Sequence, residues 1–315
     1  MSHLDPSVMP SSVPRLQSLA ESYEFCEQLA RREAGNFYHA FRLLPQPQRR
    51  AMSALYAFMR VTDDVTDGPG EPAAKRTALK SWAQELDLAL SGMYTHPLHA
   101  AFHHTVHSYC IPRPYLDAVL EGVGMDLEPV RFATFADLYT YCYRVASVVG
   151  LACIHIWGYT DEKAKVYAEA AGIGFQLTNI LRDLKEDSGR GRFYLPREDL
   201  VRFGYSQDAL ERNERNDSFR RLMQFQAERA RQFYDQSSPL GSLLHLPGRA
   251  VFQVMSRTYR GLLEAIIASD YRVFDRRIRV SRFRKLWYVL QALPVRWGWR
   301  QANHRGTEAQ RNHRE

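Results

Sequence analysis

The sequence is poor in cysteine, and its four cysteines stand singly among apolar or aromatic neighbours. Without paired spacing they indicate neither a disulfide framework nor a zinc site. We therefore expect Cys26, Cys110, Cys142 and Cys153 to be buried free thiols in a reducing compartment.

Long apolar runs are also missing. No stretch of about 18 apolar residues could span a bilayer, and no basic segment followed by an apolar one opens the chain. These absences argue against a membrane-spanning helix and a secretory leader. We expect a cytoplasmic protein, either soluble or peripheral on the inner face of the membrane.

Signals for several ligand classes are absent as well. Gly172 and Gly174 follow no strand and have no third glycine at the right offset, so they form no dinucleotide fingerprint and favour close helix packing instead. There is no zinc-finger spacing, RNP-like string or basic zipper, so nucleic acid is not an expected partner. The net charge of +7 fits a diphosphate or a lipid surface better.

What remains is an ordinary globular composition, with 45% hydrophobic and 24% charged residues among 315. No alternating strand pattern and no internal linker occur, which predicts one all-α domain. We assign residues 15–295 to that domain, 1–14 to a disordered N-terminus, and 296–315 to a basic, flexible tail.

Three expected helices bear on the later argument. Residues 112–122 form a short helix that Gly122 and Gly124 should end. Residues 134–157 read as one long buried helix, whose small residues could wall an apolar tunnel. Residues 206–236 read as one long charged helix.

The most informative stretch is 176–196, where Asn179, Asp183 and Asp187 are four residues apart. Residues at this spacing share one face of a helix. Clustered carboxylates repel each other unless a cation offsets them, and oxygen ligands suit Mg²⁺, with Mn²⁺ as an alternative. Arg192 follows in a basic turn of the kind that binds phosphate oxygens.

A second copy of this pattern lies at residues 60–67, where Asp63 and Asp67 are again four apart and Arg60 precedes them by one turn. One such helix alone would favour an ordinary solvated helix end. Two of them predict facing helices that hold metal ions and a diphosphate between them.

A histidine-rich segment offers a competing metal site. His99, His103 and His107 are four apart and could share a face. No cysteine or carboxylate is interleaved with them, so a mixed, exposed face is the better interpretation.

The strings DDVTD (63–67), NILRDLKED (179–187) and RFYLP (192–196) together resemble the squalene/phytoene synthase family, over about residues 37–271. These are head-to-head prenyl transferases. The resemblance implies a single-domain isoprenoid-synthase-type helical bundle around a central apolar cavity. It also implies Mg²⁺ and prenyl diphosphate substrates.

The resemblance assigns roles by position. The implied metal ligands are Asp63, Asp67, Asn179, Asp183 and Asp187; the implied diphosphate-binding residues are Arg60, Gln176, Asn179, Arg182, Arg192 and Tyr259; the implied catalytic residues are Tyr141, Arg60 and Tyr56; and the expected cavity residues are Phe37, Phe41, Val145 and Val149. Ser147 replaces the usual glycine of the family string that begins at Tyr141, and we expect it to narrow the cavity.

The implied reaction ionises one allylic diphosphate and couples it with a second. We favour two farnesyl diphosphates (C15), condensed through presqualene diphosphate to squalene or a precursor, with NADPH as a possible hydride source. The alternative is phytoene synthesis from two geranylgeranyl diphosphates (C20). A terpene cyclase is disfavoured by the repeated aspartate motif, and a non-catalytic scaffold protein would be expected to lose those carboxylates.

The region 271–300 interleaves basic residues with aromatic ones. This pattern suits contact with an anionic membrane surface. A last helix that packs on the core with a basic outer face explains it equally well, and both interpretations stay open.

Overall fold

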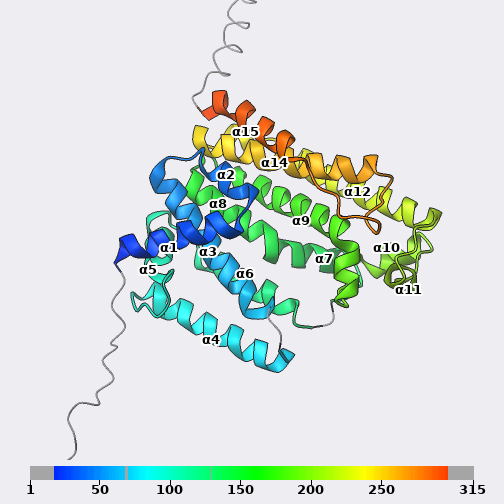
Figure 1. The fold of residues 1–315 in the computed structure, drawn as a ribbon, viewed down its shortest axis with the longest axis horizontal. Helices are drawn as coiled ribbons and strands as arrows, with labels where there is room; N and C mark the ends of the chain where they lie inside the picture. Colours follow the sequence, from blue (N-terminus) through cyan, green and yellow to red (C-terminus); the bar gives the residue numbers. More distant parts are fainter. Residues whose placement is uncertain (1–17, 68–69, 129, 297–315) are drawn as a thin grey trace, which may run out of the picture.

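The computed structural model describes residues 18–67, 70–128 and 130–296. Within these ranges the chain forms helices and two isolated β-bridges, and no strand. The all-α prediction is therefore confirmed. The helices, in chain order (Figure 1), are α1 (Leu19–Glu33), α2 (Asn36–Phe41), α3 (Gln46–Asp67), α4 (Pro72–Leu90), α5 (His99–Ser108), α6 (Arg113–Met125), α7 (Phe135–Cys142), the π-helical η1 (Tyr143–Ser147), α8 (Val148–Trp157), α9 (Lys163–Gly189), α10 (Arg197–Arg202), α11 (Gln207–Glu211), α12 (Asp217–Ser237), α13 (Leu240–Leu243), α14 (Leu246–Ala268) and α15 (Arg282–Arg296).

The longest helix, α9, lies at the centre of the bundle and packs against α12, η1, α8 and α14. Figure 1 shows α14 and α15 along one edge of the molecule and α4 along the opposite edge. Buried apolar side chains form two clusters. One joins α1, α3, α5 and α8, and the other joins α9, α12 and the end of α14. Burial of these faces is the main driving force for the bundle.

Gly172 explains how α9 approaches η1 so closely. A Cβ atom at this position would lie 2.4 Å from the Cα atom of Ser147. Only glycine fits there, which confirms that close helix packing accounts for this glycine. Ser147 itself is buried, and its hydroxyl donates to the Glu169 carbonyl at 2.8 Å.

The predicted helix over 134–157 is wrong in its continuity. It consists of α7, η1 and α8, because the five residues of η1 adopt π-helical geometry. The predicted end of the preceding helix is also wrong, since α6 continues through both of its glycines to Met125. At Gly122 a Cβ atom would lie 2.9 Å from Val145. This glycine permits a close approach to η1 and does not terminate the helix.

The predicted helix over 206–236 is likewise two helices, α11 and α12. Asn213 takes a left-handed conformation with φ of 55°. Asn216 then caps α12, its side-chain oxygen accepting from the Phe219 amide at 2.9 Å. Asparagine side chains can satisfy backbone hydrogen-bonding groups in turns and at helix starts. They thereby compete with continuous helix, and the expected helix is divided here.

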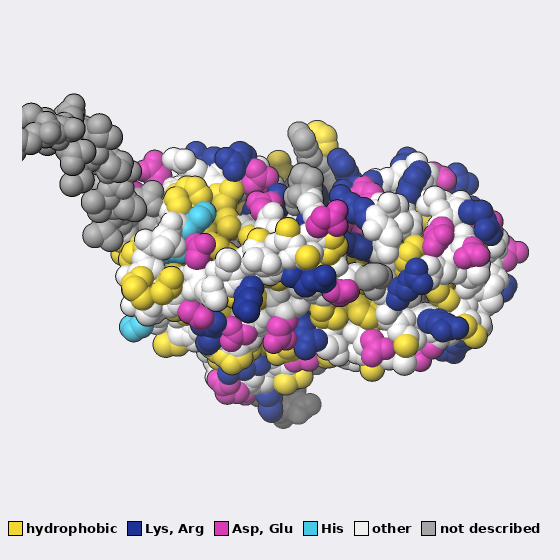
Figure 2. All heavy atoms as spheres, turned by 90° about the horizontal axis from the view of Figure 1, so that it is seen from below, with side chains coloured by type: hydrophobic (Ala, Val, Ile, Leu, Met, Phe, Trp, Pro, Cys, Tyr) yellow, Lys and Arg dark blue, Asp and Glu magenta, His cyan; other side chains and the backbone are white. Residues whose placement is uncertain are grey.

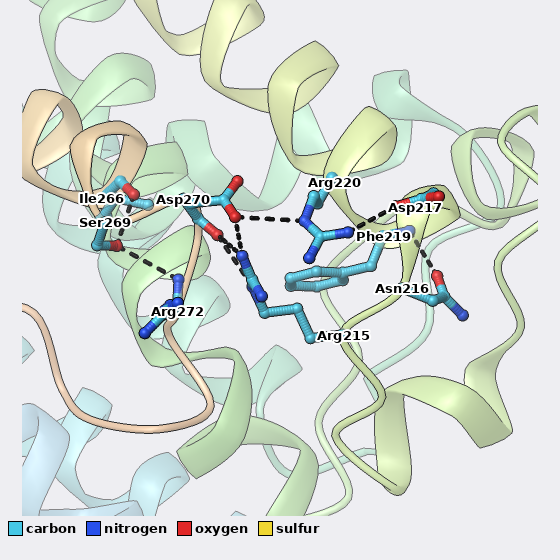
Figure 3. A network of polar contacts seen from close by, with 9 residues as sticks. All are labelled: Arg215, Asn216, Asp217, Phe219, Arg220, Ile266, Ser269, Asp270 and Arg272. Carbon is cyan, nitrogen blue, oxygen red and sulfur yellow. Dashed lines mark hydrogen bonds and ion pairs between the residues drawn. The ribbon is translucent and has the colours of Figure 1, made fainter.

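A polar network fixes the chain where it leaves α14 (Figure 3). Asp270 and Tyr271 both have left-handed backbones. Arg215 donates to the Asp270 carbonyl at 2.8 Å, and Arg220 bridges the carboxylates of Asp270 and Asp217. The turn is thereby held against the start of α12, and the segment 272–281 is directed across α9 towards α15.

Two sequence expectations about single residues need correction. Cys26, Cys142 and Cys153 are buried, but Cys110 is exposed, and all four are free thiols. His99 is buried rather than part of an exposed histidine face. The His99 ring turns inward beneath the start of α5. Its Nδ1 atom accepts hydrogen bonds from the backbone amides of residues 95 and 96, at 3.2 and 3.1 Å.

No helix in the described ranges is long and apolar enough to cross a bilayer. The predicted disordered segment 1–14 lies outside the described residues, as does the tail beyond Arg296, the last residue of α15.

Candidate active site

An apolar cavity of about 260 Å³ lies among α2, α3, η1, α8, α9 and α14. Phe41, Val145 and Val149 line it, as does Tyr56 from α3. Phe37 belongs to α2, and its side chain lies outside those described. Ser147 is not among the lining residues and faces α9 instead, so the expectation that it narrows the cavity is wrong.

One end of this cavity is polar. Gln176 and Asn179 enter it from α9, and Tyr259 enters it from α14. The Asn179 amide nitrogen lies 3.4 Å from the Gln176 side-chain oxygen and also neighbours the Tyr259 hydroxyl. The Asn179 Oδ1 atom is buried and accepts no hydrogen bond. A buried acceptor without a partner is costly, and a cation or a donor from a ligand would satisfy it.

The first aspartate pair lies at the end of α3. Partial burial and then the negative charge of Asp67 raise the pKa of Asp63 to about 7. The nearby Asp67 carboxylate disfavours the charged form of Asp63 and so adds to this rise. Arg60 forms an ion pair with Asp64, one turn along the same helix. Arg60 therefore neutralises Asp64 and forms no ion pair with Asp63 or Asp67 in the described structure.

The second aspartate pair lies at the end of α9. Asp183 is held by Arg182, and by Arg277 of the segment after α14, whose Nη2 lies 3.1 Å from its carboxylate. Asp187 is half-buried, and burial followed by repulsion from Asp183 raises its pKa to about 7. The same electrostatic signature thus marks one carboxylate of each pair.

Asp126, the residue that caps α6, connects the two pairs and was not found by sequence reasoning. Its charge raises the pKa of both Asp63 and Asp187, so Asp126 lies close enough to interact with one aspartate of each motif. The Tyr194 hydroxyl donates to Asp126 at 3.0 Å. Asp126 has no carboxylate four residues away, so spacing gave no signal.

Tyr141 belongs to this same group. Its hydroxyl lies 3.2 Å from the Asp126 carboxylate and 3.2 Å from the Tyr194 oxygen. Burial, and then the charge of Asp126, hold the pKa of Tyr141 well above its usual value. The phenol therefore stays neutral at neutral pH and can donate a hydrogen bond.

Arg192 supplies the opposing charge. Its side chain lowers the pKa of Asp126 and of Asp187, and Asp67 is also among its electrostatic neighbours. Its backbone amide donates to the Asp187 carbonyl at 2.9 Å, which fixes the turn after α9. The structure thus brings the basic turn next to both aspartate pairs.

The donor set fits Mg²⁺. In the described part of the chain, no three His, Cys, Asp or Glu side chains already surround a point that could hold a metal. The aspartates come instead as two mutually repelling pairs near an orphaned amide oxygen. Mg²⁺ commonly binds through one or two carboxylates, several waters and substrate phosphate oxygens, and it needs no complete protein cage.

An apolar cavity in a helical bundle, with paired aspartates that begin one helical turn beyond its lining residues Met59 and Asn179, is typical of enzymes that act on diphosphates of hydrophobic chains. Within that class, the chain belongs to the squalene/phytoene synthase family, whose model matches residues 30–284. The match covers the cavity, both aspartate pairs and the beginning of α15.

Several similar curated proteins are phytoene synthases. The chain is 37% identical to the 15-cis-phytoene synthase of Synechococcus elongatus, with 86% of this chain and 92% of the relative covered. It is 36% identical to the chloroplastic phytoene synthase 1 of Arabidopsis thaliana, with 91% of this chain and 68% of the relative covered.

Solved structures show the same fold. A dehydrosqualene synthase in complex with ligand superposes with a TM-score of 0.80 at 27% identity, covering 87% of this chain and 96% of that one. A squalene synthase from Alicyclobacillus acidocaldarius gives a TM-score of 0.76 at 27% identity, with 80% and 95% covered. These matches agree with the predicted helical bundle.

Proposed function

We propose that this enzyme condenses two geranylgeranyl diphosphates head to head to give phytoene. The supporting observation is the 34–37% identity to phytoene synthases, compared with 27% to the solved dehydrosqualene and squalene synthases. The C15 preference inferred from the sequence rested on no pocket residue, and the relatives favour the C20 alternative over it. Condensation of two farnesyl diphosphates remains the second candidate, supported by the structural neighbours.

In the proposed mechanism Asp63, Asp67, Asp183 and Asp187 would hold Mg²⁺ with Asn179. When bound, the metal supplies Lewis-acid stabilisation of the leaving diphosphate. Arg60, Arg182 and Arg192 carry the positive charge that binds phosphate oxygens. Gln176 and Tyr259 orient the diphosphate end of the chain at the polar end of the cavity.

The apolar part of the cavity then protects the allylic cation from water. Phe41, Val145 and Val149 offer no nucleophile. The Tyr56 ring can face the cation, an interaction worth about 0.5–2 kcal/mol, so exclusion of water is the larger contribution. Tyr141 remains protonated and donates its hydrogen bond towards departing phosphate oxygens.

The proposed condensation of two C20 chains needs no NADPH. Coupling two C20 chains to phytoene releases two diphosphates and two protons, and no hydride enters. Asp126 is suited to accept a proton, because burial raises its pKa above the usual value. NADPH belongs only to the C15 alternative, in which a hydride reduces the final cation to squalene.

The partners of the proposed enzyme are its prenyl diphosphate substrates. The predicted contact between the C-terminal region and a membrane surface, and a cytoplasmic location on its inner face, stay predictions. The exposed side of α15 is the structural feature that bears on them.

Product analysis by mass spectrometry tests the proposed function. Purified protein is incubated with Mg²⁺ and either geranylgeranyl or farnesyl diphosphate, with and without NADPH. We expect a C40 hydrocarbon from the C20 substrate, independent of NADPH, and none from the folded Asp63→Asn/Asp187→Asn variant. A C30 product from farnesyl diphosphate alone would establish the second candidate. No product from folded wild-type protein would favour the scaffold interpretation.

A further inference from the structure

Helix α15 exposes a continuous apolar stripe. Phe283 is 87% exposed, Leu286 and Trp287 are each 57% exposed, and Leu290 is 48% exposed. Their spacing places them on one face of the helix, which we call the α15 apolar face. The other side of α15 is buried, with Ala292 fully covered, and packs along α14. The apolar stripe therefore faces outward from a helix whose opposite side is fixed against α14.

Such clustering is unusual for this molecule. Four of the nine large hydrophobic side chains that are exposed in the described residues lie on α15, and the other five are spread over other elements. The face seen from below, on the α4 side in Figure 1, shows positive and negative side chains interspersed with hydrophobic ones (Figure 2). A contiguous exposed apolar patch marks an interaction surface, whereas isolated apolar residues do not.

The surroundings of the α15 apolar face are strongly basic. Residues 272–296 contain eight Lys and Arg and one acidic residue. Arg276, Arg279 and Arg284 are exposed, and no carboxylate in the described part of the chain lies within 4 Å of their charged nitrogen atoms. Arg277 is the exception, because it turns inward to Asp183. The charge on this side is therefore available to an anionic partner.

A groove beneath α15 leads towards the catalytic cavity. It measures about 1,250 Å³ and is walled by α15 on one side and by the arginine-bearing ends of α1, α2 and α3 on the other. It shares Thr258 and Lys285 with a second cavity of about 500 Å³. That cavity shares Met255 and Tyr259 with the catalytic cavity. A series of adjoining cavities thus extends from the candidate site to the groove beneath α15.

We propose that the α15 apolar face docks on an anionic lipid bilayer, so that the groove beneath it opens at the membrane surface. Aromatic and leucine side chains flanked by arginines match the acyl–headgroup boundary of such a bilayer. A second copy of the chain fits poorly, because symmetric pairing through this face would bring together two groups of arginines that lack an ion-pair partner among the described residues, including Arg276, Arg279 and Arg284. The proposal concerns binding and does not depend on which prenyl chain is the substrate.

The test is sedimentation of the full chain with vesicles of phosphatidylglycerol, and with vesicles of phosphatidylcholine as the neutral comparison. We expect binding to the anionic vesicles that weakens with salt, and little binding to the neutral ones. The Phe283→Ser/Leu286→Ser/Trp287→Ser variant should bind at least tenfold more weakly. Because these side chains are largely exposed, its melting temperature should match that of the wild type.

The matched control is Met93→Ser/Val166→Ser/Val201→Ser, which removes three exposed apolar side chains from other elements and should bind as the wild type does. Wild-type protein that ignores anionic vesicles would overturn the proposal, and so would a folded α15 variant with unchanged binding. Sedimentation velocity without lipid tests whether a second copy of the chain binds the α15 apolar face instead. A concentration-dependent dimer that the α15 variant abolishes would assign the face to a second copy and reject the membrane.

Discussion

Asp126 shows how a single residue can join two motifs that the sequence keeps apart. It receives the hydrogen bond of Tyr194, neighbours Tyr141, and interacts electrostatically with an aspartate of each pair. Burial raises its pKa, yet Arg192 opposes that rise. A group balanced in this way can exchange a proton during the reaction, which none of the paired aspartates can do while they hold metal.

Replacement of Asp126 tests this role. We expect Asp126→Asn to lower kcat by about 100-fold or more, because the amide keeps the size of the side chain but neither carries charge nor accepts a proton. Turnover is measured with Mg²⁺, alongside circular dichroism to verify folding. Glu128→Gln is the control, since Glu128 is exposed, two residues further along, and among the described residues forms an ion pair only with Arg76. Equal activity of both variants would remove Asp126 from the mechanism.

His99 controls acid stability from outside the active site. Burial, and then the proximity of His96, lower the pKa of His99 to about 4, whereas an unfolded histidine titrates near 6.5. Between these values the unfolded chain binds the extra proton, so the free energy of unfolding falls as pH drops from about 6.5 to 4.

Urea unfolding at pH 7.5, 6 and 5 measures this contribution. We expect the wild type to lose stability over this range, and the His99→Gln variant to lose less of it. His107→Gln serves as the comparison, because His107 is exposed on the same helix, and it should retain the wild-type pH dependence. A pH profile of His99→Gln that parallels the wild type would contradict the assignment.

At the scale of the secondary-structure elements, the contact between α9 and η1 positions the cavity wall. Gly172 lets the two backbones touch, and η1 contributes Val145 to the cavity while α9 contributes Asn179. The π-helical turn places one extra residue in each hydrogen-bonded loop, a feature that recurs at functional sites. The position of the aspartate-bearing helix thus depends on a contact at Gly172 that lies about three turns from Asp183, the nearer of its two carboxylates.

Gly172→Ala tests this contact. The added methyl group meets backbone atoms, which cannot move aside as a flexible side chain would, and we expect a loss of about 1–3 kcal/mol in the free energy of unfolding. Gly189→Ala is the matched control at the end of the same helix, where nothing lies within 4 Å of the added atom. It should be neutral or stabilise by up to about 1 kcal/mol. The urea midpoints of the two variants are compared. Similar midpoints would show that α9 can move away from η1 without loss in the free energy of unfolding.

At the scale of the whole molecule, folding and metal binding are separable. The two apolar clusters join every long helix, and neither includes an aspartate of the site. The hydrophobic core therefore supplies the stability, and the repelling carboxylates subtract from it.

Chelation distinguishes these contributions. After treatment with EDTA we expect turnover to disappear while the helical circular dichroism signal is unchanged, because the core needs no metal. Added Mg²⁺ or Mn²⁺ should restore turnover and raise the melting temperature, since a bound ligand stabilises the folded state. Unfolding upon chelation would mean that the metal is structural.

The sequence by itself determined the helical class, the two aspartate motifs and the family. These depend on spacing along one helix, where residues four apart are neighbours whatever the rest of the chain does. Asparagine caps and the π-helical turn escaped prediction because they alter helix continuity without disturbing the apolar period, as at Asn216 and Tyr143.

Only the tertiary structure decided which charges meet. Arg277 reaches Asp183 from a distant segment, and Asp126 interacts with aspartates of two helices that are far from it in sequence. The tertiary structure likewise decided that His99 is buried while His107, on the same helix, is exposed. Such pairings arise from how helices pack in three dimensions, and no local period encodes them. The exposure of the α15 apolar face was also decided by the tertiary structure. An apolar stripe has the same sequence pattern whether another helix covers it or not.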